Sequence, residues 1–141
     1  MTTDVAGGTR RNGWALALWA AQILLAIAYL MAGGMKVTQP MAGLAAMGMG
    51  YATVLPEAFV RFVGTMEILG ALGMILPAAT RILPVLTPLA AAGLSLVQVS
   101  AIVLHATRGE TAMTLPVNLV LLALSLFVLW GRWSKAPIEA R

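Results

Sequence analysis

Four long apolar stretches, separated by short polar segments, constrain this chain more than any other feature. They cover residues Trp14–Gly34, Phe59–Leu76, Ile82–Leu104 and Leu115–Trp130. Apolar stretches of this kind are typical of membrane-spanning helices, because crossing about 30 Å of hydrocarbon at about 1.5 Å per residue needs about 20 residues. The chain is 60% hydrophobic and only 10% charged, which excludes an ordinary soluble globular domain.

The same stretches predict the fold class. Backbone groups in lipid must find partners within the membrane, so only helices or a closed barrel can cross it. The alternation of polar and apolar residues that a barrel strand needs is missing, and the short connections favour antiparallel neighbours. We therefore predict an all-α, integral membrane, up-down four-helix bundle over residues 13–133, with cytoplasmic tails at residues 1–12 and 134–141.

The distribution of basic residues predicts the orientation of the bundle. If both termini are cytoplasmic, that side carries six cations: Arg10, Arg11, Arg81, Arg132, Lys135 and Arg141. The other side carries three, namely Lys36, Arg61 and Arg108. The excess of Lys and Arg on cytoplasmic loops favours both termini inside. The basic residues are spread over loops and chain ends and form no continuous basic surface that could track a phosphate backbone. Nucleic acid is therefore not an expected partner.

The segment between the first two stretches is apolar but too short and too rich in glycine and proline to span a membrane. We expect residues Met41–Met49 to form a short helix at the outer interface, and Met41–Tyr51 to roof the outer end of the bundle. Its methionines suit Cu(I) by their thioethers. Flexible apolar packing is the simpler explanation.

The few ionisable and amide side chains within or next to the four apolar stretches are predicted to gather at one end of the bundle. They are Lys36 after the first stretch, Arg61 and Glu67 in the second, His105 after the third and Asn118 in the fourth. In an antiparallel bundle all five lie at the outer end, and an ionisable group at membrane depth is a functional-site hypothesis by default.

Helical spacing suggests how these groups pair. Arg61 and Glu67 are six positions apart and do not share a helix face, so we expect Arg61 to reach Glu67 through a neighbouring helix or water. An i, i+4 pair between Glu57 and Arg61 is the alternative. Gln98 lies seven residues before His105 and almost on the same face.

We predict three catalytic residues: Glu67 and His105, which exchange protons, and Arg61, which holds the Glu67 carboxylate. The expected ligand contacts are Lys36, Gln98, Arg108 and Asn118. The alternative for the amides is ordinary interhelical hydrogen bonding. Cysteine is missing from the chain and histidine occurs once, so we predict no metal site. Three cations and three carboxylates balance at this end, which favours a neutral or weakly acidic ligand.

Three segments carry a resemblance to a known family: Gly33–Lys36, Arg61–Pro77 and His105–Glu110. Together they resemble the DoxX-like family of small four-helix bacterial membrane proteins, and the likeness extends over roughly residues 14–133. The resemblance marks Lys36, Arg61, Glu67, His105 and Arg108 as motif positions. It implies location in the bacterial inner membrane and an association with membrane redox assemblies, because the family takes its name from a subunit of a thiosulfate:quinone oxidoreductase.

The leading functional hypothesis is a membrane redox accessory protein that binds a quinone or similar amphipathic molecule, with Glu67 and His105 exchanging protons. Its expected partners are the lipid bilayer, a hydrophobic small molecule and a redox partner subunit. Two alternatives remain open. One is a cofactor-independent membrane enzyme, such as an isomerase, cyclase or epoxide-opening enzyme, which uses acid–base catalysis. The other is a non-catalytic scaffold or assembly factor.

Overall fold

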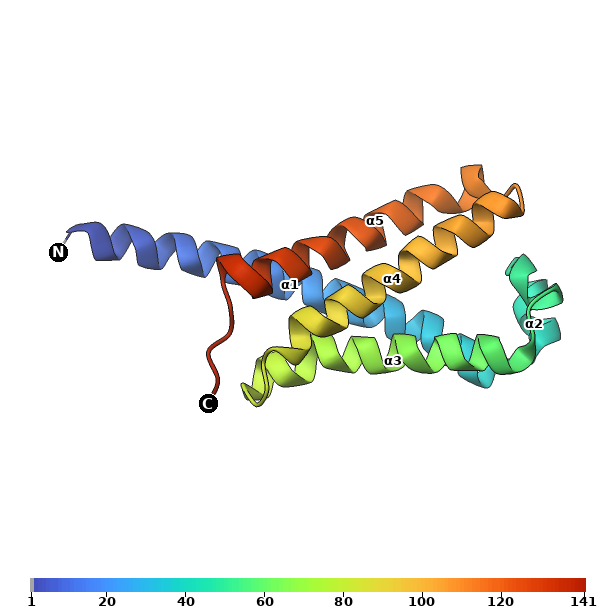
Figure 1. Cartoon of the computed structure of the whole chain (residues 1–141), viewed down its shortest axis with the longest axis horizontal. Coiled ribbons are helices and arrows are strands. Elements are labelled where there is room, and N and C mark those ends of the chain that lie inside the picture. Colours follow the sequence, from blue (N-terminus) through green and yellow to red (C-terminus); the bar gives the residue numbers. More distant parts are fainter. Residues whose placement is uncertain (1) are drawn as a thin grey trace.

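The computed structural model describes residues 2–141, and describes side chains for residues 13–110 and 114–141. All regular structure in this part of the chain is helical (Figure 1). The elements are α1 (Thr2–Thr38), α2 (Met41–Ala46), the 3₁₀ turn η1 (Gly50–Thr53), α3 (Glu57–Thr80), α4 (Leu86–Thr107), α5 (Thr111–Trp130) and the π-helical turn η2 (Gly131–Lys135).

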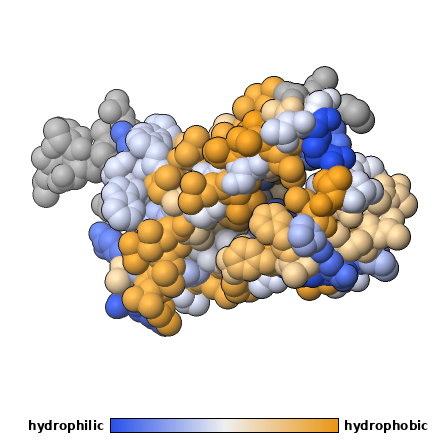
Figure 2. Space-filling view, turned by 45° about the vertical axis from the view of Figure 1, so that its right-hand side comes forward, coloured by the Kyte–Doolittle hydropathy of each residue, from blue (hydrophilic) through white to orange (hydrophobic). Residues whose placement is uncertain are grey.

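Four of the helices are long and apolar enough to cross a membrane. The candidate spans are Gly13–Thr38, Glu57–Thr80, Leu86–Thr107 and Thr114–Lys135, of 22 to 26 residues each. Large apolar side chains on all four helices are exposed, for example Leu24, Leu69, Leu96 and Val120. Hydrophobic atoms cover the middle of the face in Figure 2, and the most hydrophilic atoms lie toward its sides. Such a surface suits contact with lipid.

The long helices form an antiparallel up-down arrangement in which α1 packs along α3 and α4 packs along α5. Both chain ends lie at one end of the molecule, whereas α2 lies at the other (Figure 1). We call these the η2 end, with η2 and the α3–α4 turn, and the α2 end, with α2, η1 and the α4–α5 loop. The predicted all-α four-helix fold with a short helix between the first two spans is confirmed.

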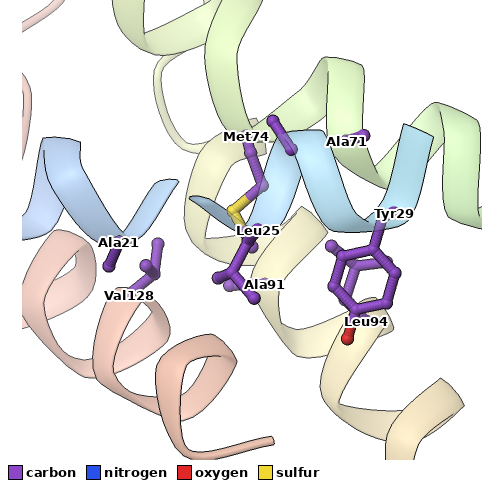
Figure 3. Close-up of a cluster of buried hydrophobic side chains, with 9 residues drawn as sticks. Ala21, Leu25, Tyr29, Ala71, Met74, Ala91, Leu94 and Val128 are labelled. Carbon is purple, nitrogen blue, oxygen red and sulfur yellow. The ribbon is translucent and has the colours of Figure 1, made fainter. Parts of the chain in front are cut away.

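Small and large side chains alternate in the central core, where all four long helices meet (Figure 3). Its buried members are Ala21, Leu25, Ala26, Tyr29, Ala71, Met74, Ala91, Leu94 and Val128. The alanines let the helices approach closely, which is the usual basis of helix packing in membranes. Tyr29 is the one core member with a polar group, and its hydroxyl points away from α1 on the side of Leu94 (Figure 3).

The corner between α3 and α4 shows how a proline is accommodated. We expected the second span to end at Leu76, but α3 continues through Pro77 to Thr80. Pro77 has no N–H to donate to the carbonyl of Gly73, four residues earlier. The buried hydroxyl of Thr87 on α4 donates to that carbonyl instead, at 3.1 Å. A hydroxyl on a neighbouring helix thus satisfies the freed group, and Arg81 then ends α3 in the left-handed conformation.

The boundaries of α1 also differ from the prediction. The Gly33–Gly34 pair was expected to end the first span, but the helix continues to Thr38. A Cβ at Gly33 would lie 2.6 Å from the carbonyl oxygen of Gly64. Gly33 therefore serves close helix packing and not helix termination. At its other end α1 begins at Thr2, so the helix continues through most of the predicted tail; Met1 lies outside the described residues, and the cytoplasmic location of the tail stays a prediction.

Between α1 and α3, α2 and η1 form a small apolar layer of their own. Leu44, Ala52 and Val60 are buried in it. Partly buried side chains pack around them: Met35, Met41, Ala45, Met49, Tyr51 and Leu55. Three of the methionines considered for copper thus lie in apolar packing. The layer connects the end of α1 to the start of α3, where the candidate site begins.

Candidate functional site

The central feature of the site is an ion pair between α1 and α3. The ammonium of Lys36 donates to both carboxylate oxygens of Glu67, at 2.8 and 2.9 Å. The Glu67 side chain is only 4% exposed and that of Lys36 16%. A lone charge at this depth would be very costly, so the two groups depend on each other.

Glycine spacing explains why these two helices can bring the charges together. Each charged residue lies three positions after a glycine, in Gly33–Lys36 and in Gly64–Glu67. A Cβ at Gly64 would lie 2.6 Å from the Cβ of Lys36 and 2.9 Å from the carbonyl oxygen of Gly33. The helix backbones therefore touch where the glycines meet, and the adjacent turns place the Lys36 and Glu67 side chains within bonding distance.

Arg61 does not hold Glu67, so the predicted pairing is wrong. Its guanidinium donates at 2.6 Å to the carbonyls of Lys36 and Gln39 and at 3.0 Å to the Glu57 carboxylate. The i, i+4 alternative is the pair that forms. A cation at a helix C-terminus satisfies carbonyls that lack intrahelical partners and complements the helix dipole. Arg61 thus fastens the end of α1 to the start of α3, beside the pair.

A pocket of about 440 Å³ lies next to the ion pair, between α3 and α4. Its polar lining residues are Lys36, Glu67, Tyr51 and Ser100. The other lining residues are Leu55, Phe59, Val60, Phe62, Val63, Leu96, Val97, Ala101 and Leu104. Because Phe62 and Leu96 are 57% and 70% exposed, the pocket opens on the apolar surface of the bundle. Apolar walls with a few convergent polar groups are typical of small-molecule sites.

Tyr51 of η1 closes the α2 side of this pocket. Its ring lies 5.9 Å from the Lys36 ammonium, within the range of a cation–π contact. Burial, and secondarily the negative charge of Glu67, raise the pKa of Tyr51 to about 12. The phenol therefore stays protonated at neutral pH, and its hydroxyl donates to Sδ of Met49 at 3.1 Å.

His105 and Arg108 form a second cluster at the α2 end, in the α4–α5 connection. Nδ1 of His105 lies 2.9 Å from one Glu110 carboxylate oxygen, and Nε of Arg108 donates at 3.0 Å to the other. The hydrogen bond to His105, together with Arg108, lowers the pKa of Glu110. A Cβ at Gly50 would lie 2.8 Å from both Arg108 and Glu110, so η1 rests against this cluster. The structure therefore brings His105 to Glu110 and not to Glu67.

The two predicted amides lie elsewhere. Gln98 is buried, and its Oε1 has no hydrogen-bond partner among the described residues. Nδ2 of Asn118 is equally without one. Neither residue lines the pocket. Near Gln98 and Ser125 lies the hydroxyl of Tyr29, which sequence reasoning missed because Tyr29 sits inside an apolar stretch.

The η2 end holds a polar cluster that the sequence analysis also missed. Nε of Arg132 donates to Oε1 of Gln22 at 2.7 Å, and Nε2 of Gln22 donates to the Met74 carbonyl at 2.6 Å. Gln22 is completely buried and Arg132 is 5% exposed. The available signal was Gln22 itself, an amide inside the first apolar stretch. For Arg132 the sequence supports only a contribution to the charge asymmetry that predicts orientation.

Comparison with known proteins agrees with the fold. The chain matches the protein-family model of the DoxX-like family over residues 20–128. Searches of curated proteins and of solved structures found no match. The matched region contains all four long helices in whole or in large part, together with the Lys36–Glu67 pair and the pocket beside it. This four-helix membrane protein therefore belongs to the DoxX-like family.

Proposed function

We propose that the protein binds a lipid-soluble small molecule with a polar head, such as a quinone, in the pocket between α3 and α4. The observation that carries the proposal is a buried Lys36–Glu67 pair that lines an apolar pocket opening toward lipid. A ligand could enter laterally from the membrane past Phe62 and Leu96. Its polar head would then reach Lys36 and Glu67, the charged residues among the described lining of the pocket.

The lining side chains suit an uncharged head group with carbonyl or hydroxyl oxygens. Lys36 can donate a hydrogen bond and Glu67 can accept one. The protonated phenol of Tyr51 can donate to a ligand oxygen in place of its present bond to Sδ of Met49. The charges at the α2 end form internal pairs, Lys36 with Glu67, Arg61 with Glu57 and Arg108 with Glu110. A strongly charged ligand would have to break a pair, so a neutral or weakly acidic one is favoured.

A bound quinone would supply reversible two-electron, two-proton chemistry. In this role Glu67 and Lys36 would hold or move the proton at the polar head. His105 would act at a distance from the pocket, through the Glu110 cluster against which η1 rests. We further propose a location in the bacterial inner membrane with both termini cytoplasmic, and a redox partner subunit; the charge asymmetry and the family resemblance support these.

A binding titration with decylubiquinone tests the proposal. The purified protein in detergent should bind the probe saturably, and Glu67→Gln should weaken binding about 10-fold or more, since about 1.4 kcal/mol corresponds to a factor of ten. Glu57→Gln is the matched control, because Glu57 is on the same helix but does not line the pocket. Its affinity should stay within about 2-fold.

A second variant pair covers the case in which Glu67→Gln fails to fold. Ser100→Trp fills the pocket from α4 and leaves the ion pair intact, whereas Val99→Trp adds the same ring at an exposed neighbour outside the pocket. Only Ser100→Trp should abolish binding. Equal binding by all four variants, or no saturable binding by the unaltered protein, would contradict the proposal and favour a scaffold in which the pair only fixes helix packing.

A cofactor-independent membrane enzyme is a second candidate, and one observation favours it. Lys36, Tyr51 and Glu67 bring three groups that can carry a proton to the same apolar pocket. Such a set can serve as general acid and base toward a lipid-soluble substrate. Conversion of an isoprenoid epoxide by the protein, lost in Glu67→Gln and retained in Glu57→Gln, would distinguish this enzyme from a quinone-binding accessory.

A further inference from the structure

Arg132, at the η2 end, is a buried cation whose hydrogen bonds go to neutral groups. Within the described structure it donates to Gln22 and, at 3.0 Å, to the carbonyl of Ala136, and its guanidinium lies 5.6 Å from the Trp19 ring. Its Nη2 has no hydrogen-bond partner there. A charge held this far from water is costly unless an opposite charge meets it.

Arg132 lines a second pocket, of about 510 Å³. Besides Arg132, the lining residues are Leu83, Pro84, Val85, Pro88, Trp133, Pro137, Ile138 and Ala140. Leu83, Val85 and Trp133 are largely exposed apolar residues, so the pocket has an apolar rim around one charged side chain. The start of α4 also borders it and adds the partial positive charge of a helix N-terminus.

The position of this pocket along the chain places it at a membrane boundary. Arg132 lies three residues before the end of the span Thr114–Lys135, and the pocket borders the start of the span Leu86–Thr107. Tryptophan concentrates at such boundaries, where lipid head groups meet acyl chains. A buried guanidinium with an apolar rim at this depth suits a phosphate that carries hydrocarbon chains.

We propose that the pocket at the η2 end binds the phosphate group of an anionic membrane phospholipid, and that Arg132 is its principal ligand. Nη2 of Arg132 is buried and has no hydrogen-bond partner among the described residues, and it would donate to a phosphate oxygen once the pocket lining shifts to admit the head group. The phosphate would supply the negative charge that the described residues do not place beside Arg132. The acyl chains would leave the pocket over Leu83, Val85 and Trp133. Gln22 positions the guanidinium by accepting from Nε, with its own amide fixed on the Met74 carbonyl.

Native mass spectrometry of the detergent-purified protein tests the site with added phosphatidylglycerol. Arg132→Gln should reduce phosphatidylglycerol affinity about 10-fold or more, because a charge-assisted hydrogen bond is lost. Arg81→Gln removes an exposed cation at the same end, which bonds to the Glu139 carbonyl. This control should change the affinity by less than about 2-fold.

A second pair keeps the test valid if Arg132→Gln fails to fold. Val85 is exposed and borders the pocket, so Val85→Glu would place a carboxylate beside Arg132 without disturbing the core. It should displace the lipid, whereas the uncharged Val85→Gln should retain it. Equal affinity of Val85→Glu and Val85→Gln would overturn the proposal.

Two competitors identify the source of the phosphate. Unlabelled phosphatidylglycerol should compete fully, whereas diacylglycerol, which has no phosphate, should not compete. Competition by diacylglycerol as strong as by phosphatidylglycerol would overturn the proposal in favour of an apolar groove alone. Full competition by millimolar inorganic phosphate would overturn the assignment to a lipid and indicate a site for free anions.

Discussion

The two ends of the bundle handle buried charge in opposite ways. At the α2 end, Lys36 and Glu67 neutralise each other between α1 and α3, and the neighbouring cations Arg61 and Arg108 have carboxylate partners of their own. At the η2 end, Arg132 is equally buried but is held by an amide, a carbonyl and an aromatic ring. The charges at the α2 end balance one another without an added ion, whereas the positive charge of Arg132 at the η2 end can still bind an anion.

The contrast suggests different partners for the two ends. An internally neutral pair beside an apolar pocket suits an uncharged ligand that hydrogen-bonds to it. A cation that has no counter-charge among the described residues, beside an apolar rim, suits an anionic group. Depth in the membrane raises the free-energy cost of every unpaired charge. Four substitution or titration experiments can therefore test how differently the two ends depend on their buried charges.

The largest effect is expected from splitting the Lys36–Glu67 pair. Lys36→Met leaves the Glu67 carboxylate buried without its partner and should lower the free energy of unfolding by about 3–5 kcal/mol. The double variant Lys36→Met/Glu67→Gln removes both charges and should recover most of this loss. Unfolding titrations with SDS in mixed micelles measure the free energy of unfolding of the single and the double variant. Equal losses in the single and double variants would show that the pair does not act as a unit.

The second largest loss of stability is expected from disturbing the Gly33–Gly64 contact, which positions the Lys36–Glu67 pair. Gly33→Ala places a methyl group against the backbone of Gly64 and should destabilise the protein by about 1–3 kcal/mol, since neither helix can give way without moving the pair. Gly34→Ala is the matched control, because nothing lies within 4 Å of a Cβ there. Helix propensity alone would make that change stabilising by up to about 1 kcal/mol. Similar unfolding energies for both variants would exclude a tight α1–α3 contact.

At the η2 end, loss of a charge should matter less than at the α2 end. Arg132→Met in lipid-depleted detergent removes a buried cation and leaves Oε1 of Gln22 without its donor, so the two effects oppose each other. We expect a net loss below about 1.5 kcal/mol in the same unfolding titration. A loss as large as that of Lys36→Met would erase the contrast between the ends and imply a counter-charge at Arg132.

The smallest effect concerns pH and the contact between η1 and the α4–α5 loop. The folded state lowers the pKa of Glu110, so its contribution to stability is present above the ordinary glutamate pKa and is lost as pH falls through the lowered value. Below that value, protonated Glu110 no longer pairs with Arg108. The protection factors of the Gly50 and Gly109 amides, which correct for the intrinsic pH dependence of exchange, should then fall, while those around Gln22 stay constant. Glu110→Gln should remove the pH dependence of the protection factors at the α2 end; protection factors that keep it would contradict the assignment to Glu110.

Sequence reasoning was most successful where it relied on the length and spacing of apolar stretches. Four spans, a short helix between the first two, and an end with three cations and three carboxylates all followed from it. The pairings within that end did not. Whether Glu67 meets Arg61 or Lys36 depends on how closely α1 and α3 approach. That approach is set by the contact between Gly33 and Gly64, whereas the hydropathy pattern places Gly33 only near the end of the first apolar stretch.

Isolated polar residues in apolar stretches were the other source of error. Gln22 and Thr87 were not predicted to be hydrogen-bonding groups of the interior, because a single polar residue changes the hydropathy of a span very little. Their roles depend on partners far along the chain: Gln22 bonds to Met74 and to Arg132, 52 and 110 positions away. Spacing within one helix carries no information about such partners.

The sequence by itself determined that the chain is a four-span helical membrane protein of the DoxX-like type, because the cost of exposing backbone and charge to hydrocarbon leaves few other solutions. Only the tertiary structure decided which charges neutralise one another. Ion pairs form over about 3 Å, and a shift of one helical turn between α1 and α3 would exchange partners without altering the hydropathy of either helix. For the same reason, only the packed bundle distinguishes the paired Lys36 from Arg132, whose Nη2 has no hydrogen-bond partner in the described part of the chain.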